Sequence, residues 1–266
     1  MQEFHSILLV GCGNMGGAML AGWLAGAYDP ARFTVVDPYL EQAPQGVSLL
    51  RELPSASFDA ILLGVKPQLL GDVAPRLAGL AGADTILLSI LAGAELASLA
   101  ECFPSAKGIV RIMPNLAAAV GKSPIAMAQR GLGEDDSARV MALMKPLGTP
   151  EWIDEARFDA VTALAGSGPA FVYRFIDALA EGAAALGMAR DQARRLALAT
   201  VEGASALAAS SPHGPGELAR RVASPDGTTE AGLQVLDADD ALARLVAATL
   251  KAAADRSAEM AAAARG

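Results

Sequence analysis

Three glycines near the start of the chain have the spacing of a loop that binds phosphate groups. The segment ILLVGCGNMGGAML reads as a buried strand, the pattern Gly11-x-Gly13-x-x-Gly16 and then a helix. In such a loop the first glycine permits a tight turn, the second lets the backbone approach a pyrophosphate, and the third lets the helix pack closely on the strand. The helix N-terminus adds free N–H groups and a positive dipole. The pattern predicts a dinucleotide site that comprises Gly11, Cys12, Gly13, Asn14, Met15 and Gly16.

An acidic residue, Asp37, ends the second apolar run, 21 residues after Gly16. A carboxylate at this place accepts hydrogen bonds from the adenosine ribose of NAD and repels the 2′-phosphate of NADP. No Arg or Lys follows closely in the sequence to hold such a phosphate. We therefore expect NADH or NADPH as the cofactor, with NADH preferred. The alternative role for Asp37 is only to cap a turn before Pro38.

Small or polar residues also stand at the ends of three later apolar runs, in VKPQ, SILAG and RIMPN. The carboxyl ends of parallel strands line the ligand crevice of an open α/β sheet. We therefore expect further contacts with the dinucleotide from Val65, Lys66, Pro67, Ala92, Gly93 and Asn115. Taken singly, each segment is as well explained by an ordinary turn after a strand.

The apolar runs that must position these residues are short and do not alternate with polar residues. They cover residues 7–10, 33–36, 60–65, 85–90, 108–113 and 124–128, with TPEWID (149–154) as a further candidate. Such runs are typical of strands covered on both faces. With helical stretches between them, they predict an α/β fold with a Rossmann-type, doubly wound, mostly parallel sheet over residues 1–155.

After about residue 155 the sequence is helical and rich in alanine. We expect residues 156–266 to form an all-α domain. The apolar faces of these helices are too extensive for so few helices to bury among themselves, so we expect them to pack against a second subunit in a homodimer.

Composition excludes several other classes of protein. The formal net charge is −8 and Lys and Arg form no cluster, so a nucleic-acid partner is not expected. Residues 4–28 lack charged side chains, but Glu3 precedes them and six glycines interrupt them, so we expect no membrane segment. The only cysteines, Cys12 and Cys102, form no pair or metal-ligand motif, which indicates a reducing cytoplasm and no metal.

Five segments together resemble the pyrroline-5-carboxylate reductases. VKPQ, SILAG, RIMPN, ALAGSGPAF and SPDGTTEAGL occur in the order and spacing of that family, and the resemblance runs over nearly the whole chain. It implies a Rossmann domain followed by a helical dimerisation domain, in dimers or rings of dimers. It also implies the last step of proline biosynthesis, in which NAD(P)H reduces the cyclic imine of 1-pyrroline-5-carboxylate to L-proline.

The segment from Gly227 to Glu230 reads as a helix N-terminus with a threonine near its cap, and the N–H groups of such an end suit a carboxylate. In the family that this chain resembles, the loop holds the substrate carboxylate and the second threonine bonds the imine nitrogen. The resemblance thus implies Thr229, Ser224 and Lys66 as catalytic residues, and Gly227, Thr228, Thr229, Ser167 and Asn115 as substrate-binding residues. A plain capped helix is the alternative.

Two observations bear on the substrate. The chain has only two histidines, His5 and His213, and Val172 stands where similar hydroxyacid dehydrogenases carry a lysine base. Imine reduction needs no such base. Against this, Asp226 replaces the family's usual glycine, and Ala219-Arg220 replaces its usual Lys-Asp. A reductase of a six-membered cyclic imine and a non-catalytic dinucleotide-binding regulator therefore stay open as alternatives.

Overall fold

The computed structural model describes residues 3–264 and divides into two compact units. The first unit contains the residues up to 166 together with those from 253 onward, and the second unit contains residues 167–252. The division therefore falls after residue 166, later than the boundary at 155 that the sequence indicates. The C-terminal part of the last helix also belongs to the first unit.

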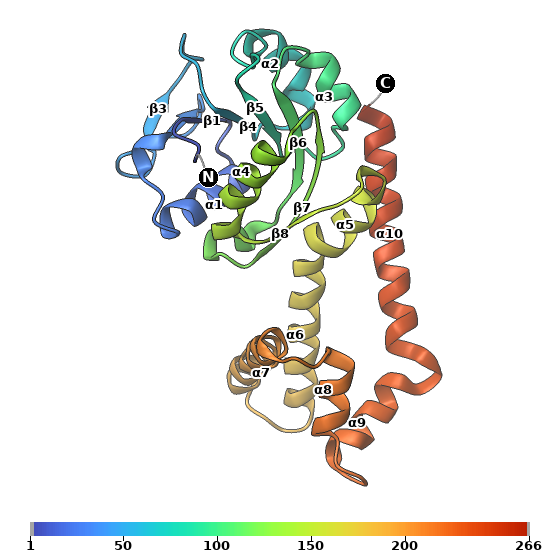
Figure 1. The fold of residues 1–266 in the computed structure, drawn as a ribbon. Coiled ribbons are helices and arrows are strands. Elements are labelled where there is room, and N and C mark those ends of the chain that lie inside the picture. The colour runs from blue at the N-terminus through green and yellow to red at the C-terminus, as the bar shows by residue number, and fades with distance from the viewer. Residues whose placement is uncertain (1–2, 265–266) are drawn as a thin grey trace. The chain divides into compact units, whose positions relative to one another are not determined.

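An eight-stranded sheet forms the centre of the first unit (Figure 1), in the order β3-β2-β1-β4-β5-β6-β7-β8. The strands are β1 (Ile7–Val10), β2 (Phe33–Val36), β3 (Ser48–Leu50), β4 (Ala60–Leu63), β5 (Ile86–Ser89), β6 (Gly108–Met113), β7 (Ser123–Arg130) and β8 (Gly148–Trp152). Only β6 and β7 pair antiparallel. The predicted strands and the mostly parallel Rossmann-type sheet are confirmed. The edge strand β3 escaped prediction because its three residues form no buried apolar run.

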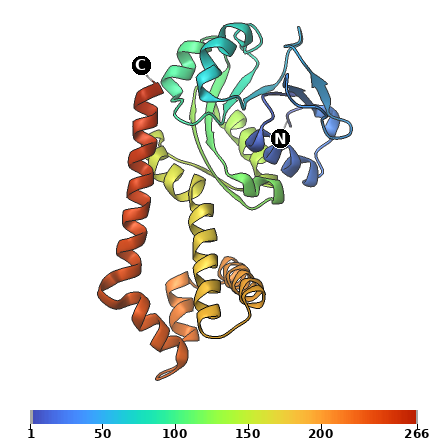
Figure 2. The same ribbon diagram turned by 180° about the vertical axis from the view of Figure 1, so that it is seen from behind.

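Helices cover both faces of this sheet, which explains why its strands do not alternate (Figure 1, Figure 2). In β1, Ile7 and Leu9 belong to one apolar core, which contains residues of α1 (Asn14–Ala25) and α4 (Glu134–Met144). Leu8 and Val10 belong to the other core, with residues of α2 (Leu70–Leu77) and α3 (Leu96–Cys102). All four β1 side chains are buried.

The position of β1 between β2 and β4 creates the crevice of the fold. The chain leaves β1 toward β2 and β3 on one side, and it later enters β4, β5 and β6 on the other side. Connections therefore diverge at the carboxyl end of β1, and in open α/β sheets ligands bind at such a switch point.

The second unit is entirely helical among its described residues. Its helices are α6 (Gly168–Ala185), α7 (Arg190–Ser210), α8 (Pro215–Val222), α9 (Thr228–Asp237) and the start of α10 (Ala241–Ala264). The short turn η7 (Ala238–Asp240) also belongs to this unit, and the short turns elsewhere in the chain are η1 (Pro30–Arg32), η2 (Pro67–Leu69), η3 (Leu116–Val120), η4 (Lys145–Leu147) and η5 (Glu155–Arg157). Only Ala180, Ala193 and Ala197 form the buried core of this unit's described part.

The start of the helical region that is expected after about residue 155 is not one helix. It consists of α5 (Phe158–Val161), a π-helical turn η6 (Thr162–Gly166) and then α6. Gly166 and Gly168 disfavour a regular helix, and Pro169 lacks the N–H group that would continue it. Pro169 therefore lies in the first turn of α6, where a missing N–H costs nothing.

Gly22 on α1 offers a test of how closely this helix packs. A Cβ atom there would overlap the carbonyl oxygen of Ala118 and lie 2.7 Å from the side chain of Leu147. We expect Gly22→Ala to lower the free energy of unfolding by roughly 1–3 kcal/mol. Gly17→Ala is the control on the same helix, because its Cβ would meet only Cys12 O at 3.8 Å. Urea unfolding checks both, and equal stability of Gly22→Ala and wild type would contradict the packing.

Candidate active site

Gly11 closes the end of β1 against the neighbouring strands. Its N–H donates to Val36 O at 2.9 Å, and Gly64 N–H donates to Val10 O at 2.8 Å. Gly11 has φ +87°, and a Cβ atom on it would lie 2.9 Å from backbone atoms of Gly64 and Val65. The turn therefore needs glycine both for its left-handed backbone and for the closeness of β4.

The other two glycines of the loop differ in what surrounds them. A Cβ atom on Gly16 would lie 2.9 Å from Gly11 O, so this glycine allows α1 to pack on the loop, as predicted. A Cβ atom on Gly13 would meet nothing within 4 Å. Gly13 is the N-cap residue of α1, and among the described residues no side chain caps that helix start. Open space beside uncapped first-turn N–H groups fits a pyrophosphate.

A cavity of about 650 Å³ adjoins this loop. Its walls come from the ends of β1, β2 and β4, from the segment after β3 and from α2. Of the predicted cofactor residues, Gly11, Gly13, Asp37, Val65 and Lys66 line it. Cys12, Asn14, Met15, Gly16 and Pro67 belong to the same loop, to the start of α1 or to η2, but they do not line it.

The carboxylate of Asp37 is held by backbone N–H groups of two loops. Cys12 N donates to Oδ2 at 2.8 Å, while Tyr39 N and Leu40 N donate to Oδ1 at 2.8 and 3.2 Å. Asp37 is half-buried and lines the cavity. Asp37 thus caps the turn after β2 and also lines the cavity, while its contact with a cofactor ribose stays a prediction.

Two arginines that sequence spacing did not reveal line the same cavity. Arg51 lies directly after β3, and its Nη1 donates to the carbonyl oxygens of Asp37 at 3.0 Å and Leu40 at 2.5 Å. Arg76 comes from α2. No Arg or Lys follows Asp37 closely in the sequence, but the parallel pairing of β2 with β3 brings the more distant Arg51 to the Asp37 turn. The sequence did not reveal Arg51 as a residue of this cavity because strand β3, which places it there, was not predicted.

Cys12 lies in the glycine loop as a buried thiol. Burial raises its pKa, and the negative charge of Asp37 raises it further. The side chain therefore stays neutral near pH 7, so that no thiolate opposes an anionic ligand at this loop.

Asn115 follows β6, and its side-chain amide both donates and accepts a hydrogen bond. Its Nδ2 donates to Ala165 O at 2.9 Å, and its Oδ1 accepts from Ala117 N at 3.0 Å. Its backbone N–H donates to Ser123 Oγ at 2.9 Å. Asn115 thus ties β6 to the π-helical turn η6. Its contacts with cofactor and substrate remain predictions.

The segment SPDGTT forms a tight turn before α9 in the second unit. Gly227 N donates to Ser224 O at 2.9 Å, with Pro225 and Asp226 between them and φ +59° at Asp226. This is the pattern of a type II turn, whose third residue needs a left-handed backbone. Asp226 supplies that conformation in place of glycine, and it is exposed to solvent.

Gly227, and not a threonine, is the N-cap residue of α9. A Cβ atom on Gly227 would overlap Ser224 Oγ, so these two residues fit only as a pair. The first helical bond in this segment runs from Ala231 N to Gly227 O. The N–H groups of Thr228, Thr229 and Glu230 precede it and have no intrahelical acceptor. Gly227 has no side chain to cap these N–H groups, and the carboxylate of Glu230 accepts instead from Asp226 N, one residue before the N-cap, at 2.7 Å.

Ser167, the remaining predicted substrate residue, is half-buried at the N-cap position of α6. Lys66 is exposed where η2 begins. Within residues 3–264, no cluster of three or more His, Cys, Asp or Glu could hold a metal ion. None of the described helices is long and apolar enough to cross a membrane.

Comparison with known proteins adds independent findings. A family model for pyrroline-5-carboxylate reductase dimerisation matches residues 155–260. A pyrroline-5-carboxylate reductase of Pseudomonas aeruginosa is 35% identical over 271 residues, which cover 96% of each of the two chains.

Solved structures agree with the sequence match. The structure of a pyrroline-5-carboxylate reductase from Coxiella burnetii is similar with a TM-score of 0.89 at 28% identity, over 96% of this chain and 98% of that one. A pyrroline carboxylate reductase of Plasmodium falciparum, solved with NADP bound, is similar with a TM-score of 0.82 at 25% identity, over 98% and 100% of the two chains.

Proposed function

The chain belongs to the pyrroline-5-carboxylate reductase family, and on that basis we propose that it reduces 1-pyrroline-5-carboxylate to L-proline with NADH or NADPH, in the last step of proline biosynthesis. The observation that carries the proposal is the likeness to a reductase over nearly the full length of both chains. The glycine loop of the first unit and the open helix start of the second supply the two kinds of site that the reaction needs.

The first unit suits a reduced dinucleotide. Gly13 leaves open space at the start of α1, and Asp37 is fixed at the end of β2, so the pyrophosphate and the adenosine ribose each have a partner. When bound, a reduced dinucleotide would supply hydride to the ring carbon of the protonated imine, and the electron pair of the C=N bond would then go to nitrogen. The protein has only to bind and orient the imine.

The start of α9 suits the substrate carboxylate. The N–H groups of Thr228 and Thr229 lie at the positive end of a ten-residue helix, and such ends bind anions. We assign the carboxylate to the backbone of residues 227–229 and the imine nitrogen to the hydroxyl of Thr229. Ser224 supports this role through Gly227, and we further propose that Ser167 and Asn115 bind substrate and that Lys66 takes part in catalysis.

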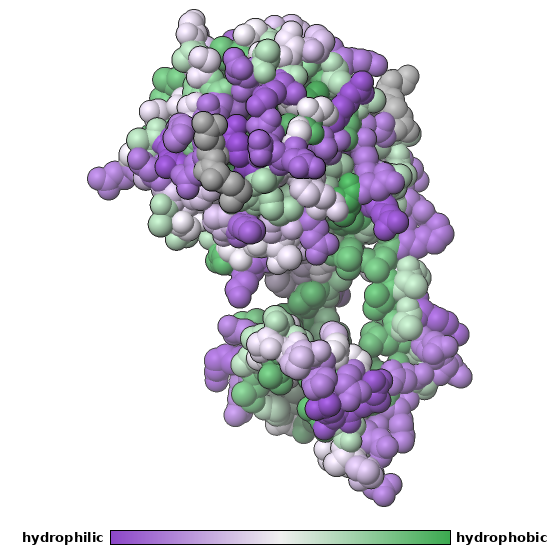
Figure 3. Space-filling view, viewed as in Figure 1, coloured by the Kyte–Doolittle hydropathy of each residue, from purple (hydrophilic) through white to green (hydrophobic). Residues whose placement is uncertain are grey.

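The helices of the second unit suit a partner copy of the same chain. Large apolar side chains are exposed on α6 and α10, and Figure 3 shows apolar surface on the helices of this unit. Among them are Val172, Tyr173, Phe175, Leu179, Leu245 and Val246. Because the described part of this unit buries only three alanines in its core, we propose a homodimer, able to assemble further into a ring of dimers. Two separate free thiols are consistent with the cytoplasm as its location.

For the cofactor we propose a preference for NADH. The carboxylate of Asp37 is fixed by three amide hydrogen bonds, and its charge opposes a 2′-phosphate. Arg51 already donates to two carbonyl oxygens, which makes it a clasp of the turn after β2. Its positive charge nevertheless weakens the discrimination, so NADPH should be accepted with lower efficiency.

The function is tested by adding five-membered or six-membered cyclic imine acids to the enzyme with NADH or NADPH and measuring the loss of absorbance of the reduced dinucleotide. We expect turnover with 1-pyrroline-5-carboxylate and much lower kcat/KM with the six-membered homologue, because Asp226 acts as a turn former with its side chain in solvent. Preference for the larger ring would instead identify a different imine reductase. Tight dinucleotide binding without any turnover would indicate a regulatory protein.

Replacing Thr229 tests the role of its hydroxyl. We expect Thr229→Ala to lower kcat/KM by about five- to 150-fold, the equivalent of roughly 1–3 kcal/mol of lost transition-state binding. Thr229→Ser keeps the hydroxyl and should retain most of the activity. If Thr229→Ala and wild type have the same kcat and KM, the hydroxyl does not contact the imine.

Asp37 and Arg51 together test the cofactor assignment. Asp37→Asn should raise the ratio of kcat/KM for NADPH to that for NADH by roughly ten-fold, about 1.4 kcal/mol. Any damage to the amide contacts affects both cofactors and cancels in the ratio. Glu41→Gln removes a nearby charge outside the cavity and should leave the ratio unchanged.

Arg51→Ala should reduce the efficiency with both cofactors if Arg51 clasps the turn. A loss confined to NADPH would show instead that Arg51 binds the 2′-phosphate. A wild-type preference for NADPH would overturn the proposed preference itself.

A further inference from the structure

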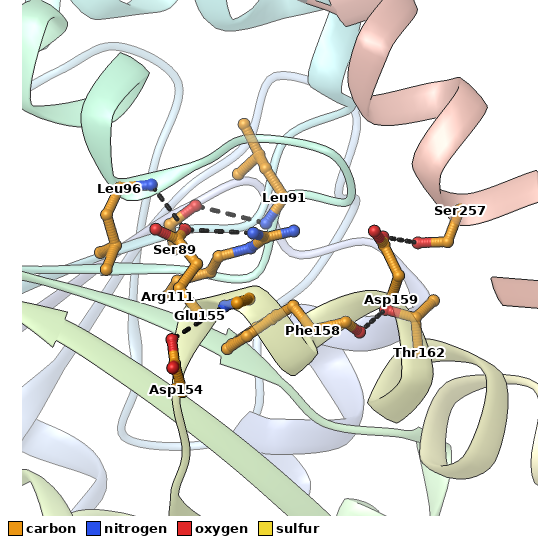
Figure 4. A network of polar contacts seen from close by, with 11 residues as sticks. Ser89, Leu91, Leu96, Arg111, Asp154, Glu155, Phe158, Asp159, Thr162 and Ser257 are labelled. Carbon is orange, nitrogen blue, oxygen red and sulfur yellow. Dashed lines mark hydrogen bonds and ion pairs between the residues drawn. The ribbon is translucent and has the colours of Figure 1, made fainter. Parts of the chain in front are cut away.

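A buried arginine lies beneath the carboxyl end of the sheet. Arg111 projects from β6 with only 5% of its surface exposed. Its Nη1 donates to Glu155 Oε1 at 3.1 Å, and its guanidinium carbon lies 4.3 Å from the ring centroid of Phe158 (Figure 4). A charge this deep in the protein costs free energy unless it is paired, so the pair fixes Glu155 in place.

Glu155 uses the same oxygen to hold the beginning of α3. Its Oε1 accepts a hydrogen bond from Leu96 N at 2.8 Å, across 59 residues of sequence. Leu96 is the first residue of α3, and the residue at the N-cap position, Glu95, makes no side-chain cap. The carboxylate of Glu155 thus satisfies a first-turn N–H group that α3 cannot satisfy by itself.

The segment held in this way is the turn that follows β5. Leu91 N donates to Ser89 Oγ at 3.3 Å, and Ala94 N donates to Leu91 O at 3.4 Å. Gly93 has φ +78°, as the third residue of a type II turn requires. Leu91, Ala94 and Leu96 are buried, whereas Ala92 is exposed. The turn is therefore anchored at both ends and presents its tip to solvent.

The far side of the same turn packs against the C-terminal part of α10. A Cβ atom on Gly93 would lie 3.5 Å from Ala261 Cα, in ordinary contact. Ser257 Oγ donates to Asp159 Oδ1 at 2.7 Å, which joins α10 to α5 just after Glu155 (Figure 4). All these residues belong to the first unit.

The order of the strands indicates which end of a bound dinucleotide would lie next to the turn at residues 91–94. Asp37 ends β2 on one side of β1, whereas the turn 91–94 follows β5, on the other side beyond β4. A dinucleotide whose pyrophosphate lies at the Gly11–Gly13 loop and whose adenosine ribose lies at Asp37 extends its other half toward β4 and β5. That half carries the nicotinamide.

We propose that Glu155 and Arg111 are positioning residues for hydride transfer, which hold the Ala92–Gly93 turn against the nicotinamide ring of the cofactor. The inference rests on the proposed function, because it assumes that a reduced dinucleotide occupies the crevice. Neither residue contacts the reacting atoms. Their effect is transmitted through Leu96 N and the buried side chains on either side of the turn.

Glu155→Ala and Glu155→Gln, with Asp154→Asn as the control, test the proposal. Glutamine keeps an acceptor for Leu96 N, so it should rescue most of what alanine loses. Asp154→Asn removes the same charge from the neighbouring residue, whose carboxylate caps η5 through Ala156 N, and should behave as wild type. The double variant Arg111→Met/Glu155→Leu removes the buried charge along with its partner, and it replaces Glu155→Ala if that variant does not fold.

Hydrogen exchange in the absence of substrate gives the first readout, which does not depend on activity. In Glu155→Ala, the amides of residues 91–96 should exchange faster than in wild type, while the amides of β1 and α1 should exchange at the wild-type rate. Unchanged exchange at 91–96 would overturn the claim that Glu155 holds the turn.

Kinetics with dinucleotide deuterated at the transferred position give the second readout. We expect Glu155→Ala to lower kcat by roughly ten- to 100-fold, with KM for the dinucleotide changed less than about three-fold and a larger isotope effect on kcat, because misplacing the ring slows the chemical step. A purely structural role would reduce the amount of active enzyme and leave the isotope effect as it is, which would overturn the proposal. If wild type turns over no imine, the proposed function is wrong. In that case, hydrogen exchange with saturating dinucleotide still tests the turn: slower exchange of the amides of residues 91–96 would show that the turn meets the cofactor, and unchanged exchange would show that it does not.

Discussion

The close approach of the Gly11 turn to Gly64 and Val65 is the constraint on which the rest of the first unit depends. β1 lies between β2 and β4, and its last residues hydrogen-bond with both neighbours. A side chain at Gly11 would collide with the backbone of Gly64 and Val65, directly after β4, and push these strands apart. With glycine there, the carboxyl ends of the central strands stay together, α1 starts directly at the crevice, and its free N–H groups face the space where a phosphate can bind.

From this centre the two halves of the crevice are built by different means. On the β2 side, backbone N–H groups from two loops fix the Asp37 carboxylate, and Arg51 clasps the turn that carries it. On the β5 side, the half-buried carboxylate of Glu155 pairs with the buried Arg111 and holds the start of α3. In both arrangements a charged side chain orients backbone groups, which helps to preorganise a site because hydrogen bonds to charged groups are stronger than those between neutral groups.

The second unit follows a different physical logic. Its buried core consists of small alanine side chains, and many of its large apolar side chains remain exposed in the single chain. Such a helical layer gains little by packing on itself, since alanine buries little apolar area. Its stability and the geometry of the turn before α9 should therefore depend on association with a second copy, which links assembly to the proposed binding of substrate.

The sequence by itself determined the features whose geometry is local. The glycine spacing at residues 11–16, the acid after β2, the open helix start at Gly227 and the tolerance of Asp226 for a left-handed backbone all follow from neighbours a few residues apart, because steric and capping rules act over that range. The buried strands were also predictable, since unbroken apolar runs are typical of a sheet covered on both faces.

Tertiary structure alone decided which distant groups meet. Arg51 reaches the turn at Asp37 from 14 residues away only because the short edge strand β3 pairs in parallel with β2. Glu155 meets Leu96 from 59 residues away only because Arg111, on a strand between them in the sequence, is buried where it needs a carboxylate. No local pattern encodes such contacts, because they depend on strand order and on which charge must be paired after the layers have packed.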